Sequence, residues 1–168
     1  MGAQIRPEAE ADRAAVRQVN ESAFGGQLEA DLVDALRGHG AVPELCMVAE
    51  EGDVLVGHIC FSEATLESGH RVLALAPMAV APGRQRRGIG SGLVLAGLEH
   101  ARTTPSALVV VVGQPEYYPR FGFERASALG LEYPGEVPDE AWMALRLPAY
   151  EPAARGLVAY APPFAELV

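Results

Sequence analysis

The feature that most constrains the fold is a glycine- and arginine-rich loop between a predicted strand and a predicted helix. The strand covers 71–80, the helix covers 93–101, and the loop contains Gln85-Arg86-Arg87-Gly88-Ile89-Gly90-Ser91-Gly92. The first backbone N–H groups of a helix lack intrahelical acceptors and carry the positive end of the helix dipole. Glycines let an anion approach such groups closely. The sequence therefore predicts an anion site where a strand passes into a helix.

The charge of the chain makes this loop stand out. The 168 residues include 13 Lys+Arg and 22 Asp+Glu, giving a net charge of −9 at pH 7, and every cation is an arginine. Arg84, Arg86 and Arg87 all lie in the loop. The negative charge argues against general nucleic-acid binding, which needs a broad basic surface. The absence of lysine excludes Schiff-base chemistry and a P-loop lysine.

Length and residue spacing set further expectations. No repeat or linker divides the sequence, so we expect a single domain over 1–168. Cys46 and Cys60 form neither a C-x-x-C pair nor a disulfide framework, and the histidines lack metal-ligand spacing, so we expect no metal. With no leader-like start and no apolar run of about 18 residues, we expect a cytoplasmic protein without a membrane partner.

Hydrophobic periodicity predicts a chain of mixed strands and helices. Residues 107–112 form an unbroken apolar run, which is typical of a strand buried on both faces. A hairpin is expected around Glu50-Glu51-Gly52-Asp53. Besides the segments named above, we expect strands at 4–6, 45–49, 54–62, 129–133, 141–147 and 157–161, and helices at 8–24, 27–37 and 117–121.

Three segments together resemble a known family. The loop sequence from Gln85 to Gly90 matches Q-x-x-G-x-G and resembles motif A of the GNAT superfamily of N-acetyltransferases, which binds the pyrophosphate of acetyl-coenzyme A. Residues 75–82 resemble the fourth strand of that family, which ends in Val-x-Pro. Tyr118-Pro119-Arg120-Phe121-Gly122-Phe123 resembles its Tyr-x-x-x-Gly-Phe signature. The sequences around Tyr118 and at 134–140 are most similar to those of the YhbS-like branch of predicted acetyltransferases.

This resemblance implies both a fold and a cosubstrate. The fold is of the α/β (α+β) GNAT type, with a central mixed, mostly antiparallel twisted sheet whose fourth and fifth strands splay apart, flanked by helices. The cosubstrate is acetyl-coenzyme A. By position, the residues that bind it are Met78, Ala79 and Val80 along the pantetheine arm, and Gln85, Arg86, Arg87, Gly88, Ile89, Gly90 and Ser91 at the pyrophosphate.

The resemblance also implies direct attack of an amine on the thioester. Tyr118 is the candidate general acid for the departing thiolate, since a tyrosine with a pKa near 10 is protonated at neutral pH. Its four-residue offset to Gly122 selects it over Tyr117, with simple aromatic packing as the alternative for both. Glu63 is the candidate base, with an exposed strand-end glutamate as the plainer alternative. A water oriented by Gln114 and Glu116 is another candidate for removing the proton.

Several points stay open at this level. The chain could be an N-acetyltransferase acting on a primary amine, or a non-catalytic acyl-coenzyme A binding module. The acceptor could be a small-molecule or peptide amine, and a homodimer is common in the superfamily. We interpret His58 as a satisfied, half-buried histidine, Cys60 as a buried structural thiol, and Trp142 either as a pocket residue or as packing for the late strands. Acidic clusters such as Glu29, Asp31 and Asp34 could attract a cationic amine, although a solvated charged face explains them more simply.

Overall fold

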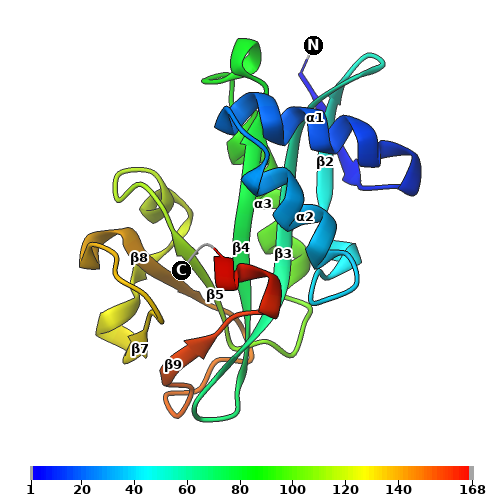
Figure 1. Cartoon of the computed structure of the whole chain (residues 1–168). Helices are drawn as coiled ribbons and strands as arrows, with labels where there is room; N and C mark the ends of the chain where they lie inside the picture. Colours follow the sequence, from blue (N-terminus) through cyan, green and yellow to red (C-terminus); the bar gives the residue numbers. More distant parts are fainter. Residues whose placement is uncertain (1, 167–168) are drawn as a thin grey trace. The chain divides into compact units, whose positions relative to one another are not determined.

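A computed structural model describes residues 2–166 of the chain (Figure 1). Within these residues a nine-stranded sheet runs in the order β1-β2-β3-β4-β5-β8-β6, and β9 pairs with β3 and β7. The elements are β1 (Gln4–Pro7), α1 (Arg13–Phe24), α2 (Leu28–Leu36), β2 (Met47–Glu51), β3 (Val54–Leu66), β4 (Arg71–Val80), α3 (Ile89–Ala101), β5 (Leu108–Val112), β6 (Glu124–Arg125), β7 (Leu131–Glu132), β8 (Trp142–Arg146) and β9 (Gly156–Ala159).

The sheet is mixed. β4 and β5 are parallel, as are β7 and β9, whereas β1–β2, β2–β3, β3–β9, β5–β8 and β6–β8 are antiparallel. The chain divides into two compact units, Met1–Phe61 with Ala76–His100, and Ser62–Leu75 with Ala101–Val168. β3 and β4 each begin in one unit and end in the other.

In the first unit, glycines allow α3 to lie close to the strands. A β-carbon on Gly57 of β3 would come within 3.0 Å of Leu93 Cδ1 and 3.1 Å of Ile89 Cγ2, both on α3. A β-carbon on Gly97 of α3 would overlap the ring of Phe61, which is fully buried. Because larger side chains at either glycine would force the helix outward, these contacts fix the position of α3 on its strands.

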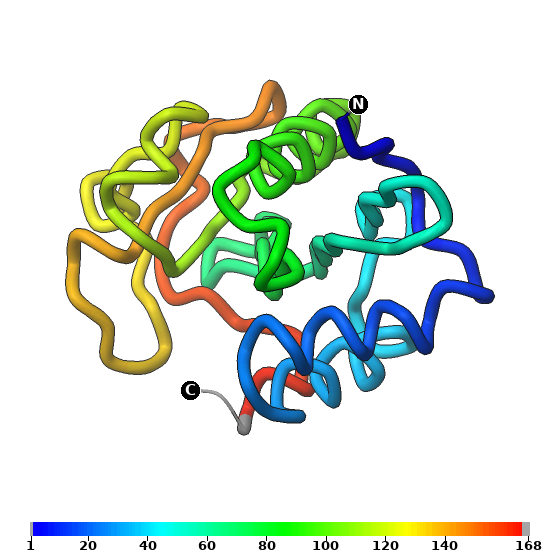
Figure 2. The backbone as a smooth tube through the Cα atoms, turned by 90° about the horizontal axis from the view of Figure 1, so that it is seen from above, coloured from blue at the N-terminus to red at the C-terminus, as the bar shows by residue number. Residues whose placement is uncertain are grey.

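The other face of these strands carries α1 and α2, which run one after the other and pack together (Figures 1 and 2). Val16 of α1, Val33 of α2 and Val48 of β2 form a buried cluster. On the solvent side, the Arg17 guanidinium donates to Asp31 at 2.7 Å and to Asp34 at 2.8 Å. The amphipathic pattern of both helices is thus used as expected, with apolar residues on the strands and charged residues outside.

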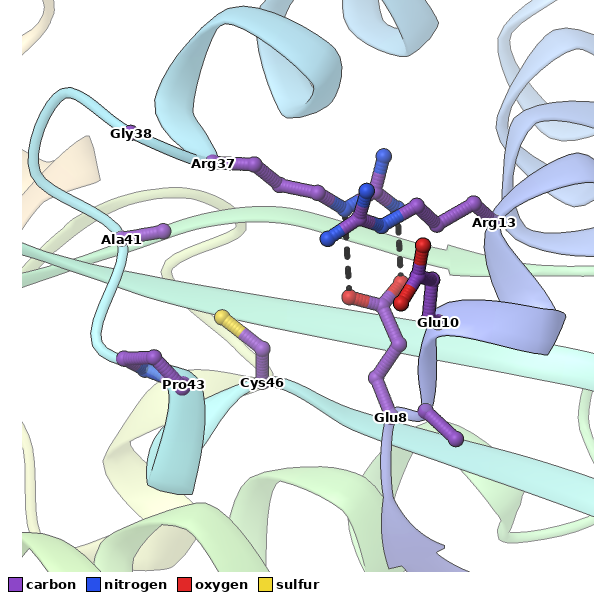
Figure 3. Close-up of a pocket in the computed structure, with 9 residues that line it drawn as sticks. Glu8, Glu10, Arg13, Arg37, Gly38, Ala41, Pro43 and Cys46 are labelled. Carbon is purple, nitrogen blue, oxygen red and sulfur yellow. Dashed lines mark hydrogen bonds and ion pairs between the residues drawn. The ribbon is translucent and has the colours of Figure 1, made fainter.

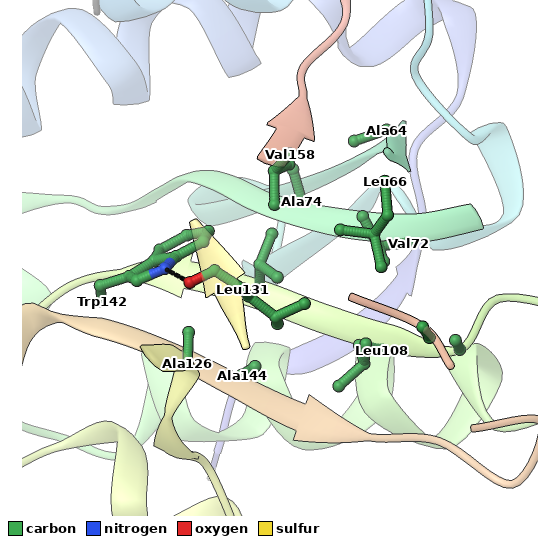
Figure 4. Packing of buried hydrophobic residues seen from close by; sticks show 13 residues of the cluster. Ala64, Leu66, Val72, Ala74, Leu108, Ala126, Leu131, Trp142, Ala144 and Val158 are labelled. Atoms are coloured by element: carbon green, nitrogen blue, oxygen red, sulfur yellow. Dashed lines mark hydrogen bonds between the residues drawn. The ribbon is translucent and has the colours of Figure 1, made fainter. Parts of the chain in front are cut away.

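In the second unit, a separate core fills the space between the strands (Figure 4). Its largest member, Trp142 of β8, is 3% exposed and donates its indole N–H to the carbonyl of Leu131 at 3.1 Å. The remaining members are apolar side chains, among them Ala64, Leu66, Val72, Ala74, Leu108, Ala126, Ala144 and Val158. Trp142 therefore packs the late strands, one of the two alternatives that the sequence left open.

Pairing between β4 and β5 is short. Their register covers Val72–Leu108, Leu73–Val109 and Ala74–Val110, and no further pair is recorded within residues 2–166, although β4 continues to Val80 and β5 to Val112. The backbone of β4 beyond Ala74 is therefore not paired with β5. The fourth and fifth strands thus pair over only three residues each, as expected for strands that splay apart.

The element boundaries correct several expectations. β4 coincides with the predicted 71–80, but α3 begins at Ile89, four residues before the expected 93. β3 extends to Leu66, so Glu63 lies inside the strand and not at its end. The expected helix at 8–24 is regular only from Arg13, and the segment expected as a helix at 117–121 is a 3₁₀ turn at Tyr118–Phe121. β6 at Glu124–Arg125 was not expected.

Candidate functional site

The loop before α3 has the backbone geometry of an anion site. Its first i→i−4 bond runs from the Gly92 N–H to the Gly88 carbonyl at 2.9 Å, so the amides of Ile89 and Gly90 precede any intrahelical acceptor. Gly88 has a left-handed φ of 83°, and an added β-carbon there would meet nothing within 4 Å. Open space over a left-handed glycine at a helix start leaves room for a bulky anion beside these two amides.

The loop is held to the strand that precedes it. The Gln85 side-chain amide donates to the carbonyl of Val80 at 3.1 Å, which closes the loop back on the end of β4. Arg86 follows with a φ of 64°, a left-handed conformation that is uncommon for residues other than glycine. The predicted cosubstrate residues Val80, Gln85 and Arg86 thus form one folded segment.

The three loop arginines do not behave alike. The Arg84 side chain forms an ion pair with Glu51 at 2.6 Å, so its charge is already matched by β2. Arg86 and Arg87 are exposed, and neither has an ion pair within residues 2–166. The sequence placed all three near an anion, whereas the structure leaves two of them available for it.

Tyr118 lies in a tight aromatic cluster of the second unit. It is 8% exposed, and its ring meets Tyr117 edge-on at 5.1 Å between centroids and Phe123 at 5.5 Å. Gly122, which follows the turn, has a left-handed φ of 102°. Burial raises the pKa of Tyr118 to about 12, so its hydroxyl keeps its proton at every ordinary pH.

Gly113, which sequence reasoning missed, sets the position of Tyr118. It follows the last residue of β5, and an added β-carbon would overlap the Tyr118 ring. The only signal in the sequence was an isolated glycine at the end of an apolar strand, which can mark a close approach of another group.

The candidate base Glu63 is exposed, and so are Gln114 and Glu116, the two side chains expected to orient a water that removes the proton. Glu63 lies within β3, and Gln114 and Glu116 lie between β5 and the turn that carries Tyr118. Glu63 is flanked by the buried Ser62 and Ala64, so the strand alternation directs it away from the core. A carboxylate in this position can accept a proton from solvent or from a bound amine.

His58 departs from the sequence expectation. It is fully buried rather than half-buried, and its Nε2 has no hydrogen-bond partner, lying 3.8 Å from Glu8 Oε2. Its Nδ1 is 3.3 Å from the Asn20 amide nitrogen. Burial, with a smaller effect of Arg37, lowers the pKa of His58 to about 3, so the imidazole is neutral at physiological pH.

The described residues form neither a metal-ligand cluster nor a membrane-spanning helix. No group of three or more His, Cys, Asp or Glu side chains among residues 2–166 could hold a metal ion. None of the helices described is long and apolar enough to cross a membrane.

Comparisons with known proteins identify the family. Residues 13–123 match the acetyltransferase (GNAT) family. The chain is 37% identical over 160 residues to the uncharacterized N-acetyltransferase YjhQ of Escherichia coli K12, an alignment that covers 90% of this chain and 88% of that protein. The chain belongs to the GNAT acetyltransferase family.

Solved structures agree with this assignment. The crystal structure of the GNAT family N-acetyltransferase YhbS from Escherichia coli in complex with CoA superposes with a TM-score of 0.88 at 28% identity, covering 98% of this chain and 92% of that one. A GNAT family acetyltransferase from Brucella melitensis in complex with acetyl-CoA gives a TM-score of 0.80 at 33% identity, covering 96% and 97%. The fold expected from the sequence is thereby confirmed.

The buried His58 predicts a specific pH dependence of stability. Its pKa is about 3 in the fold and 6.5 in the unfolded chain, so below pH 6.5 the unfolded chain gains a proton that the fold does not accept. Stability therefore falls as pH drops from 6.5 toward 3. We expect wild type to lose about 1.4 kcal/mol per pH unit more than His58→Gln in this window. Urea unfolding of both proteins at several pH values between 4.5 and 7.5 measures it.

Parallel stability curves for the two proteins would contradict this expectation. They would mean that His58 takes up a proton inside the fold and pairs with Glu8, whose carboxylate is 3.8 Å away.

Proposed function

We propose that this protein transfers the acetyl group of acetyl-coenzyme A to a primary amine by direct attack. The observation that carries the proposal is the start of α3, where two amides without intrahelical acceptors, an open left-handed Gly88 and two exposed arginines lie in one loop. Membership of the GNAT acetyltransferase family supports it, as do the complexes of YhbS with CoA and of the Brucella melitensis protein with acetyl-CoA.

The residues of the loop suit the phosphates of the cosubstrate. The amides of Ile89 and Gly90, followed by Ser91 in the first turn of α3, bind the pyrophosphate at the positive end of the helix dipole. Arg86 and Arg87 add exposed positive charge from the loop, and Gln85 keeps the loop on Val80.

The strand before the loop suits the pantetheine arm. Beyond Ala74, β4 is not paired with β5, so backbone groups of Met78, Ala79 and Val80, apart from the Val80 carbonyl that accepts from Gln85, are available to hydrogen-bond an extended ligand. This is recognition by strand addition, in which main-chain groups supply affinity with little demand on side-chain identity.

The bound cosubstrate supplies an acetyl thioester, whose carbonyl carbon accepts the amine and whose sulfur departs as a thiolate. Tyr118 donates its hydroxyl proton toward that sulfur. Burial raises the pKa of Tyr118 to about 12, so the phenol carries this proton at neutral pH. Gly113 and Phe123 hold the ring in place. Glu63 accepts the proton that the amine must lose before it attacks, since free alkylamines are mostly protonated at neutral pH.

The acceptor is proposed only as a class, a small-molecule or peptide amine. The homodimer, the cytoplasmic location and the single domain over 1–168 stay predictions from the sequence.

Two glycines of the loop form a matched test of cosubstrate binding. Gly88 has a φ of 83° whereas Gly83 does not have a left-handed φ, and neither would meet any atom within 4 Å if it carried a β-carbon. Alanine in the left-handed region costs about 1–2 kcal/mol. Because the free loop can relax and the bound loop cannot, we expect Gly88→Ala to raise the Kd for coenzyme A about five- to thirtyfold. Isothermal titration calorimetry measures it.

Gly83→Ala is the control and should leave the Kd within about twofold. If both substitutions change the Kd equally, the left-handed conformation of Gly88 does not contribute to coenzyme A binding.

Tyr118→Phe tests the general acid. The change removes only the hydroxyl and keeps the ring packed on Gly113 and Phe123, so we expect turnover to fall about a hundredfold while coenzyme A affinity stays similar. Release of free thiol from acetyl-coenzyme A across a panel of amines measures turnover, and Tyr117→Phe serves as the control with near wild-type rates.

A wild-type rate for Tyr118→Phe would exclude the hydroxyl from proton transfer. If wild type itself releases no coenzyme A with any amine of the panel, the non-catalytic binding module becomes the better interpretation.

Glu63→Gln tests the base. At pH 7 we expect kcat/KM to fall about ten- to a hundredfold, because the amine is then left mostly protonated. The deficit should shrink as the pH approaches the pKa of the free amine, about 10.4 for a lysine-like acceptor. A pH profile of kcat/KM for wild type and Glu63→Gln measures this. A decrease in kcat/KM that is constant with pH would show that Glu63 is not the base. A larger decrease in Glu116→Gln would favour the water oriented by Gln114 and Glu116.

A further inference from the structure

Two cysteine thiols lie against each other in the first unit. Cys46 immediately precedes β2, and the register of β2 with β3 pairs Met47 with Ile59, which sets Cys46 opposite Cys60. Their sulfur atoms are 3.3 Å apart. The sequence spacing of 46 and 60 gave no sign of this, because only the pairing of the strands brings the two residues together.

The two thiols differ in access. Cys60 is 2% exposed and covered by protein, whereas Cys46 lines a cavity of about 260 Å³ together with Glu8, Arg37, Ala41 and Pro43. In Figure 3 the Cys46 sulfur points toward this cavity, beside the ion pair of Glu8 with Arg37. Cys46, itself only 5% exposed, therefore borders a cavity with room for a molecule the size of hydrogen peroxide, whereas Cys60 is not among the residues that line it.

The two thiols also differ in chemistry. The hydrogen bond from Cys60 lowers the pKa of Cys46, which favours the thiolate at the sulfur that meets the cavity. The same hydrogen bond, together with burial, raises the pKa of Cys60, which keeps its proton. Because the thiolate is the reactive form of cysteine, Cys46 is suited to react first and Cys60 to react second.

We propose that Cys46 and Cys60 form an oxidation site, in which a small hydroperoxide such as hydrogen peroxide converts the two thiols into an intramolecular disulfide. This site does not depend on the proposed acetyl transfer, because neither cysteine, nor any residue around them, belongs to the cosubstrate loop or to the Tyr118 cluster.

The chemistry balances in two steps. The Cys46 thiolate attacks one peroxide oxygen, the O–O bond breaks, and hydroxide leaves and takes up a proton to become water, which leaves a sulfenic acid on Cys46. The Cys60 sulfur then attacks the Cys46 sulfur, the S–S bond forms, the S–O bond breaks, and the hydroxyl leaves with the Cys60 proton as a second water. Two thiols are oxidised and one peroxide is reduced to two waters.

The test uses the whole protein in its folded state. Hydrogen peroxide is added in small excess and removed with catalase, after which the protein is unfolded in guanidinium with iodoacetamide and weighed by mass spectrometry. We expect both thiols to be lost to alkylation together, with a mass decrease of about 2 Da, a linked peptide pair containing Cys46 and Cys60, and recovery with dithiothreitol.

Single variants resolve the order of the two steps. Cys60→Ser keeps the accessible thiol and removes its partner, so dimedone should capture a sulfenic acid on Cys46 that does not accumulate in wild type. Cys46→Ser leaves only the covered thiol, which should oxidise at least about tenfold more slowly. Circular dichroism checks that both variants fold, and the wild-type masses decide the question by themselves if a variant does not.

Three results would overturn the proposal. These are two thiols that both stay open to alkylation after peroxide treatment, a Cys46 that advances to sulfinic acid while Cys60 stays a free thiol, and a disulfide that links two chains on a non-reducing gel.

Discussion

The position at which α3 begins is the constraint on which the proposed chemistry depends. Gly57 lets Ile89 and Leu93 settle directly on β3, and Gly97 lets the same helix lie against the Phe61 ring. Because those contacts fix the helix, the loop must connect the end of β4 to a set starting point. The left-handed backbone conformations of Arg86 and Gly88 allow the loop to make this connection. The amides of Ile89 and Gly90 are therefore held in place by packing several residues away.

The sequence predicted the loop and its ligand class because those depend on local chemistry. Glycines before a helix, with arginines among them, carry the same meaning in any fold, and the strand before them was placed correctly at 71–80. The helix start was misplaced by four residues because the apolar residues from Leu93 onward give the stronger signal. What brings the start forward to Ile89 is its contact with Gly57, a residue more than thirty positions earlier in the chain. Such contacts cannot be read from one segment.

The same limit explains why the sequence underestimated the burial of His58, while the expected burial of Cys60 is correct. His58 and Cys60 alternate with apolar residues in β3, which is typical of a strand with one wet face. In the fold that face is covered by α1 and α2, so both side chains are buried, and His58 meets Asn20 while Cys60 meets Cys46. Only the packing of two helices on that face distinguishes an exposed histidine from a neutral buried one. The proximity of the two thiols likewise needed the strand register.

The distribution of ion pairs gives the arginine-only composition a physical role. Two of the acidic positions considered for attracting an amine are matched internally, since Asp31 and Asp34 both accept from Arg17. Arg37 joins Glu8 to the same region through Asp34. Because a guanidinium has several donors in a fixed fork, one arginine can hydrogen-bond to two carboxylates at once, where a lysine would act as a single point charge.

Among the arginines without an ion pair in the described residues, Arg86 and Arg87 are informative because they lie beside the start of α3. In a chain with a net charge of −9, carboxylates are in excess, yet Arg86 and Arg87 have no ion pair within residues 2–166. Their neighbour Arg84 does have one, with Glu51. The arginine side chains and the amides without intrahelical acceptors both raise the local positive potential. Placing them side by side is therefore unfavourable unless an anion binds there. The charge pattern of the loop is therefore complementary to a ligand that carries several negative charges, as a pyrophosphate does.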